Sequence, residues 1–197
     1  MPFVEPVDLV GDLVLLRPLR VEDHDGLVAA ASDGELWTLG YTGVPRPAEM
    51  HEAIAGWLDR QREGLLMPFT VRRRDTDEII GMTTFCNIDG AHRHVEIGGT
   101  WNARSVHRTG TNTESKLLLL AHAFDRLDCI AVEFRTHWLN QQSRHAIERL
   151  GAKQDGILRS HKLMRDGTVR DTVAYSIIRS EWPAVRNELQ RRLRLHR

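Results

Sequence analysis

Hydrophobic and polar positions along this chain follow two different repeats, and the order of these repeats predicts the fold. Runs that are apolar or alternate with polar residues are typical of strands, and they cover residues 9–17, 66–74, 78–88, 92–101, 129–138, 157–165 and 168–179. Apolar residues three or four positions apart are typical of helices, and they cover residues 21–31, 47–63, 111–124, 141–150 and 181–195. Because no internal repeat or linker interrupts this order, we expect one α+β domain over residues 1–197.

Short-range signals support several of these boundaries. Asn140 stands where an N-cap is expected before the helix at 141–150, and Gly151 stands where that helix would end. Asp166-Gly167 separates the last two predicted strands and is a strong hairpin signal. The C-terminal region is therefore expected to run helix, hairpin, helix.

The stretch from Val95 to Phe124 predicts a strand, then a loop, then a buried helix. Residues 102–112 are rich in Gly, Asn, Ser and Thr, so the apolar repeat breaks there. Thr111 and Glu114 fit a capping box at the start of the helix. The free amides of such a helix start can bind an anion, although a capped core helix after a surface loop fits the spacing equally well. Neither a GxxxxGK[ST] loop nor a GxGxxG fingerprint is present.

Composition narrows the classes of function. The 27 basic residues balance the 27 acidic ones, so no overall field favours nucleic acid or membrane, and we interpret the basic C-terminal helix as a solvated helix end. Cys86 and Cys129 are isolated in apolar runs, which favours free thiols in a reducing compartment.

With no signal peptide and no long apolar run, we expect a cytoplasmic protein. His92 and His94 lack a third ligand partner, so we expect no metal.

The loop His107-Arg108-Thr109-Gly110-Thr111-Asn112, with EIGGTW before it and NTESKLLLL after it, resembles a known motif. It is similar to the acetyl-CoA-binding motif of the GNAT superfamily of N-acetyltransferases, in the RimJ/RimL-like branch (ribosomal-protein N-terminal acetyltransferases). That motif reads Gln/Arg-x-x-Gly-x-Gly/Ala. Gly110 agrees with it, whereas His107 and Asn112 depart from it. The resemblance extends from about Leu9 to Leu193.

The resemblance implies a mixed, mostly antiparallel central sheet of about seven strands with helices on both faces. The fourth and fifth strands are expected to splay apart and to admit acetyl-CoA. The implied reaction transfers an acetyl group to a primary amine, either a protein N-terminus or a small molecule, by direct attack in a ternary complex. The residues expected to bind the cofactor are Gly99, Thr100, Trp101, His107, Arg108, Thr109, Gly110, Thr111, Asn112, Thr113, Asn140 and Ser143.

The resemblance also implies that a backbone amide near Gly99 to Trp101 polarises the thioester carbonyl. The pair Gly98-Gly99 would let the cofactor arm pass close to the strand, although the same pair also fits a simple β-bulge. Glu96 is the candidate general base, acting through a water. Side chains alternate along a strand, so Glu96 should face opposite to Val95 and Ile97. An ordinary carboxylate paired with Arg93 or Arg135 is the alternative.

The departing thiolate also needs a partner. Many GNAT enzymes use a tyrosine in a Y-x-x-L-G pattern, but Ile147 occupies that position here. The N-x-x-S pattern of the branch is present as Asn140 and Ser143, and we expect Ser143 to stabilise the thiolate, with a helix-start serine bonded to backbone as the alternative.

Three aromatic side chains, Trp37, Tyr41 and His137, are candidates for the amine pocket, and simple packing is their alternative role. Trp57 lies on a helical stripe, so we expect it to pack in the core. A catalytically weak acyl-CoA-binding sensor remains the alternative function, and a homodimer is possible. Arg170-Asp171 resembles a subgroup signature without a role that the sequence explains.

Overall fold

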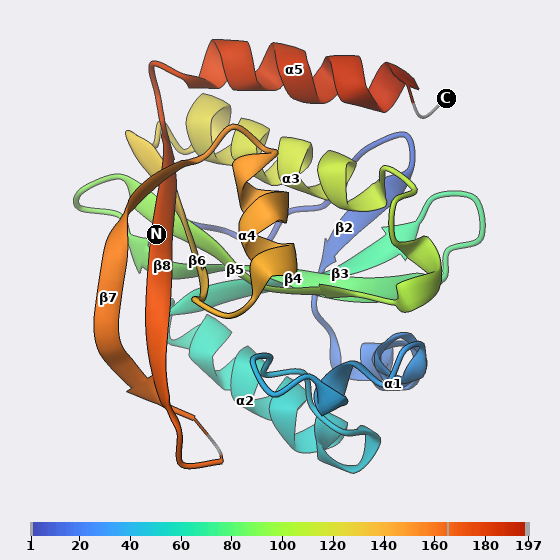
Figure 1. The fold of residues 1–197 in the computed structure, drawn as a ribbon. Coiled ribbons are helices and arrows are strands. Elements are labelled where there is room, and N and C mark those ends of the chain that lie inside the picture. Colours follow the sequence, from blue (N-terminus) through green and yellow to red (C-terminus); the bar gives the residue numbers. More distant parts are fainter. Residues whose placement is uncertain (1, 165, 196–197) are drawn as a thin grey trace.

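The computed structural model describes residues 2–164 and 166–195. An eight-stranded sheet lies between two layers of helices, with α1 and α2 on one face and α3, α4 and α5 on the other (Figure 1). The strands are β1 (Leu9–Val10), β2 (Val14–Pro18), β3 (Leu66–Arg73), β4 (Ile79–Asp89), β5 (His94–Asn102), β6 (Ala131–His137), β7 (Lys153–Leu163) and β8 (Val169–Ile178). The helices are α1 (His24–Ser32), α2 (Met50–Arg62), α3 (Thr111–Ala121), α4 (Gln141–Glu148) and α5 (Trp182–Leu195).

The strand order β1-β2-β3-β4-β5-β6-β8-β7 is antiparallel at every neighbouring pair except β5–β6. The expected mixed, mostly antiparallel sheet with helices on both faces is therefore confirmed. The hairpin at Asp166-Gly167 is also present, because Gly167 adopts a φ of +80° and the Asp166 carboxylate accepts the Thr168 amide at 3.0 Å.

The sheet has eight strands where about seven are expected, because one predicted strand is divided in two. The predicted strand 9–17 breaks at Gly11, whose amide donates to the Val14 carbonyl at 2.9 Å and closes a tight turn. Leu9 then pairs with Leu16, so the two halves of the predicted strand form a small hairpin. An apolar run alone does not reveal such a reversal, because both halves keep their hydrophobic character.

Two hydrophobic clusters fill the spaces on either side of the sheet. The larger cluster packs α3 and α5 against the sheet and includes Leu119, Leu120 and Tyr175. The smaller cluster lies under α1 and α2, and Trp57 packs against it as expected. Both cysteines are free, as the sequence indicates.

The predicted capping box at the start of α3 is not formed. Gly110 is the N-cap, with a φ of +88°, and the Thr111 hydroxyl donates to the Val106 carbonyl at 3.4 Å. The Glu114 carboxylate turns away from its own helix start and crosses to the turn between β1 and β2. There it accepts three successive amides, those of Asp12 (3.0 Å), Leu13 (2.7 Å) and Val14 (2.7 Å).

The fit between Glu114 and this turn is close. A Cβ atom at Gly11 would lie only 2.4 Å from a carboxylate oxygen of Glu114, so glycine is needed there. Three converging N–H donors satisfy the carboxylate better than the single amide of a capping box. Glu114 therefore joins the start of α3 to the edge of the sheet.

We predict that Glu114→Ala lowers the free energy of unfolding by about 3 kcal/mol, because three amides lose a charged acceptor in a partly buried turn. Urea unfolding monitored by circular dichroism measures this loss. Glu52→Ala, at an exposed position of α2, is the matched control and should change stability by no more than about 0.5 kcal/mol. Equal stability of the two variants would contradict the role assigned to Glu114.

Candidate functional site

The sheet opens between β5 and β6. Their parallel pairing covers only His94↔Ala131, Val95↔Val132 and Glu96↔Glu133. Beyond that point β6 stays paired with β8 as far as His137↔Thr172, while β5 stays paired with β4. The edge of β5 from Gly98 to Asn102 and the end of β6 therefore face a gap, and the expected splay of these two strands is confirmed.

A β-bulge at Gly98-Gly99 accompanies this opening. The register between β4 and β5 passes from Thr84↔Gly98 directly to Met82↔Trp101, and Gly99 has a φ of +56°. A Cβ atom at Gly98 would lie 3.0 Å from a Glu96 oxygen. The bulge weighed in the sequence is therefore real, and it leaves Gly99 and Thr100 exposed on the strand edge that faces the gap.

The loop before α3 presents a row of amides that have no acceptor. Within the described chain, the backbone N–H groups of Arg108, Thr109, Gly110, Thr111, Asn112 and Thr113 donate no hydrogen bond. The amide of Glu114, bonded to the Gly110 carbonyl at 2.9 Å, is the first to join the helix. Arg108 and Gly110 both adopt positive φ, of +66° and +88°. Alternating left-handed residues turn successive amides towards one concave side, which is a typical anion-binding arrangement.

Several side chains of this loop hold its shape. His107 Nε2 lies 3.1 Å from the Asn102 carbonyl, and the Thr109 hydroxyl donates to the Val106 carbonyl at 2.7 Å. Asn112 accepts a long, 3.4 Å contact from the side chain of Asn102. The Arg108 side chain is exposed and forms no ion pair with a described residue, so its guanidinium is available to an anion in the loop.

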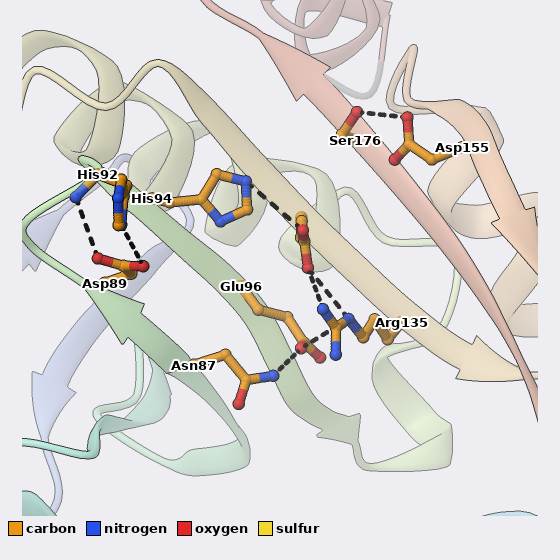
Figure 2. A network of polar contacts seen from close by, with 9 residues as sticks. Asn87, Asp89, His92, His94, Glu96, Arg135, Asp155 and Ser176 are labelled. Carbon is orange, nitrogen blue, oxygen red and sulfur yellow. Dashed lines mark hydrogen bonds and ion pairs between the residues drawn. The ribbon is translucent and has the colours of Figure 1, made fainter. Parts of the chain in front are cut away.

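Glu96 lies on the face of the sheet opposite to Val95 and Ile97, as expected, and it is the last residue of β5 that pairs with β6. Its carboxylate accepts the Asn87 side-chain amide at 2.5 Å and lies 3.6 Å from Arg135 Nε (Figure 2). Glu96 is 7% exposed, and this burial raises the pKa of its carboxyl, while the Asn87 hydrogen bond and the Arg135 charge oppose the shift. Of the two arginines considered as partners, Arg135 is close, whereas Arg93 pairs with Asp128.

The two candidate residues after β6 lie at the start of α4. The Asn140 side-chain oxygen accepts the Ser143 amide at 2.9 Å, which confirms the predicted cap. The side-chain amide of Asn140 and the hydroxyl of Ser143 make no hydrogen bond to a described residue. Both groups are therefore available to a ligand.

Two buried polar residues were not predicted from the sequence. Tyr175 is fully buried, and its hydroxyl donates to Glu148 at 3.0 Å and accepts Arg144 Nε at 3.1 Å, which joins β8 to α4. Lys116 is only 5% exposed on α3, and its amine contacts the hydroxyls of Thr100 at 2.6 Å and Thr83 at 3.0 Å. The spacing in the sequence does indicate this position, because Lys116 stands three and four residues before Leu119 and Leu120. Residues at these spacings share one face of a helix, and this face of α3 points inward.

The three candidates for an amine pocket lie on two segments, the connection between α1 and α2 and the end of β6. Trp37 packs against the smaller hydrophobic cluster, and Tyr41 is half-buried in the same connection between α1 and α2. His137 lies at the end of β6, where its Nδ1 accepts the Leu139 amide at 3.0 Å. Burial, together with the charge of Arg170, lowers the pKa of His137.

The structure explains the role of Asp171 in the Arg170-Asp171 pair. The Asp171 carboxylate accepts Arg159 Nε at 2.6 Å and the Ser160 amide at 2.7 Å, which fastens the β7–β8 hairpin. Arg170 donates from Nε to the Thr172 hydroxyl at 2.9 Å.

The part of the chain that the structure describes contains no group of three His, Cys, Asp or Glu residues able to hold a metal ion. His92 lies beside Asp89 and His94 beside Glu133 (Figure 2). No helix among the described residues is long and apolar enough to cross a membrane.

Comparison with known proteins adds to this geometry. Residues 14–153 match the acetyltransferase (GNAT) domain family. The uncharacterized N-acetyltransferase YoaA of Bacillus subtilis is 26% identical over 177 residues, which cover 87% of this chain and 96% of YoaA. A GCN5-related N-acetyltransferase from Brucella melitensis has a TM-score of 0.85 at 29% identity, covering 98% of this chain and 87% of its own. Mycobacterium smegmatis RimJ in complex with CoA-disulfide has a TM-score of 0.76 at 25% identity, covering 94% and 92%.

We predict that Glu96→Gln gains stability relative to the original chain as the pH rises from 4 to 8. A carboxyl whose pKa is raised by folding holds its proton more tightly in the folded state. Its contribution to stability is present below the unfolded pKa and is lost as the pH rises through the folded pKa. Glutamine stays neutral and avoids this loss. Urea unfolding at each pH measures the difference, and a difference independent of pH would contradict the shift.

Proposed function

The chain belongs to the GNAT family of acetyltransferases and resembles its RimJ-like members, and we propose that it transfers an acetyl group from acetyl-CoA to a primary amine by direct attack in a ternary complex. The observation that carries this proposal is the row of unbonded amides from Arg108 to Thr113, in the loop that follows β5 after its pairing with β6 has ended. The proposal treats residues 1–197 as one acetyltransferase domain. Structural neighbours that cover 96% and 98% of the chain support this.

The residues of the loop fit the pyrophosphate of the cofactor. Six amides and the positive end of α3 supply neutral donors and a favourable dipole, and Arg108 supplies a full charge. The departures from the family motif at His107 and Asn112 do not disturb this set, because both side chains contact Asn102 rather than fill the row of amides. A backbone cradle tolerates such changes.

The exposed edge of β5 would hold the acetyl-bearing arm. Gly99 and Thr100 are exposed after the bulge, and an amide of the segment Gly99 to Trp101 would polarise the thioester carbonyl. Across the gap, the free side-chain amide of Asn140 would contact the pantetheine, and the Ser143 hydroxyl would donate a hydrogen bond to the departing thiolate.

Glu96 would accept the amine proton through a water. Its raised pKa makes it a stronger base than an ordinary glutamate, and the Asn87 hydrogen bond keeps its carboxylate oriented. An α-amino group has a pKa near 8 and a lysine side chain near 10.4, so neutralising lysine requires roughly 3 kcal/mol more at neutral pH. A glutamate assisted by burial alone therefore suits an α-amino group or a similarly weak base. Trp37, Tyr41 and His137 remain candidates for contacting this amine.

We predict that acetyl-CoA raises the melting temperature of the protein and that Arg108→Ala weakens acetyl-CoA binding by roughly five- to tenfold, since one charged contact is lost. Titration calorimetry measures both affinities. Arg104→Ala, an exposed arginine in the same loop, is the matched control and should bind as tightly as the original chain. Absence of any shift at millimolar acetyl-CoA would count heavily against the proposed function.

Thiol release from acetyl-CoA across a panel of peptides with free N-termini and small amines distinguishes an enzyme from a sensor. Turnover on a member of the panel supports the transferase, and tight binding without turnover on any amine supports a catalytically weak acyl-CoA sensor instead.

We predict that Glu96→Gln lowers kcat by about a hundredfold at pH 6 to 7, where the amine is protonated, and by progressively less above the amine pKa. The reason is that a base matters only while a proton must be removed from the amine. The measurement is the pH profile of thiol release from pH 6 to 9. An unchanged profile would show that Glu96 is not the base.

A further inference from the structure

The buried amine of Lys116 has only hydroxyl partners. Thr83 Oγ1 lies 3.0 Å and Thr100 Oγ1 lies 2.6 Å from Lys116 Nζ, and the two hydroxyl oxygens are 2.8 Å apart, so the three groups form a closed triangle. Among the described residues, no carboxylate pairs with this amine. Thr83 is fully buried, whereas Thr100 is exposed on the edge of β5 that faces the gap. One hydroxyl therefore separates a buried amine from the cofactor gap.

The protonation state of Lys116 decides where the Thr100 proton points. A neutral amine has a lone pair, so it can accept the Thr100 hydroxyl while it donates to Thr83. An ammonium has three N–H donors and no acceptor, so it donates to Thr100 and forces the Thr100 hydroxyl to donate elsewhere. The Thr83 hydroxyl is nearer, at 2.8 Å, but among the described residues its own proton has no acceptor besides Lys116 and Thr100. Beside an ammonium, Thr83 therefore donates to Thr100, and the Thr100 hydroxyl turns to the Gly98 carbonyl, 3.5 Å from its Oγ1.

The Gly98 carbonyl belongs to the same peptide group as the Gly99 N–H, inside the bulge. A hydrogen bond to a peptide carbonyl strengthens the N–H of that peptide as a donor, because linked hydrogen bonds polarise one another. The Gly99 amide is one of those suited to polarise the thioester carbonyl. A charge on Lys116 would therefore reach the reacting carbonyl through Thr100 and one peptide group.

We propose that Lys116 is a positioning residue whose ammonium, acting through the Thr100 hydroxyl, polarises the peptide between Gly98 and Gly99 in the cofactor-bound protein. This inference rests on the proposed function, because the peptide matters only if a thioester lies against it. Lys116 follows the first residue of α3 by five positions, or roughly 7.5 Å along the helix axis, so phosphates held at Arg108 to Thr113 would favour the charged amine.

The free protein is poised for this change. Burial lowers the pKa of Lys116 to about 7, and among the described residues only a charged Cys86 thiolate would act to raise it. Burial raises the pKa of Cys86 to about 12, so this thiol stays neutral and does not compete. Binding of the anionic cofactor would then draw a proton onto Lys116.

Titration calorimetry with acetyl-CoA at pH 8, in buffers of different ionisation enthalpy, tests this coupling. At this pH the 3′-phosphate of the cofactor is already ionised, so its own protonation contributes little. We expect the original chain to take up about half a proton on binding, and Lys116→Met to take up none. We also expect Lys116→Met to lower kcat roughly tenfold without lowering the melting temperature, because the variant removes a buried amine without a charged partner.

Two further variants distinguish the proposed action of Lys116 through Thr100 from a general loss of structure. Thr100→Val should lower kcat similarly yet retain the proton uptake, because the amine remains. Lys153→Met places the same substitution at an exposed lysine and should change neither measurement. Unchanged proton uptake in Lys116→Met would overturn the proposal, and so would normal kcat in Thr100→Val.

The calorimetric result also separates this proposal from the proposed function. Proton uptake that depends on Lys116, in a protein that acetylates no amine, would support the coupling and contradict the transferase. Acetyl transfer without such uptake would support the transferase and contradict the coupling.

Discussion

The early end of pairing between β5 and β6 is the constraint on which the site depends. Two parallel strands normally continue side by side, but here only three residue pairs form before the strands separate. The bulge at Gly98-Gly99 supplies a physical cause, since an extra residue bends its strand and increases the local twist. Because β5 and β6 are parallel, the loops that lead from them to the start of α3 and the start of α4 leave the sheet at the same end, beside the unpaired edge of β5.

Helix α3 must be held firmly for this opening to work, because its first turn presents the amides and its second turn presents Lys116. Apolar packing fixes its depth against the sheet, yet apolar contacts are not directional. Two polar contacts add direction. Glu114 joins the helix to the turn between β1 and β2, and Lys116 joins it to Thr83 and Thr100 on the central strands. The helix is therefore fixed on both sides of its axis.

Structural features that depend on neighbouring residues could be predicted from the sequence, whereas features that depend on contacts between distant residues could not. The order of elements, the Asn140 cap and the Asp166-Gly167 hairpin each depend on a few neighbouring residues, and each is present. Glu114 matched a local capping box, but its partners lie 100 to 102 residues away, and three converging amides outcompete one local amide. Tyr175 and Lys116 were missed for the same reason, since their partners lie on other elements. The loop itself was found because its composition breaks the apolar repeat, whereas the gap beside it was known only from the family resemblance.

The two buried titratable groups beside the bulge face opposite sides of the sheet, and burial moves each towards its neutral form. The pKa of Glu96 is raised on one side and the pKa of Lys116 is lowered to about 7 on the other. Acetyl transfer creates a positive charge on the attacking amine and a negative charge on the carbonyl oxygen in the same step. In the proposed reaction, a carboxylate at Glu96 on the amine side and an ammonium at Lys116 behind the carbonyl would match that charge separation in sense. Because neither group is fully compensated by a permanent partner, each can respond to charge in the gap more strongly than a saturated ion pair would.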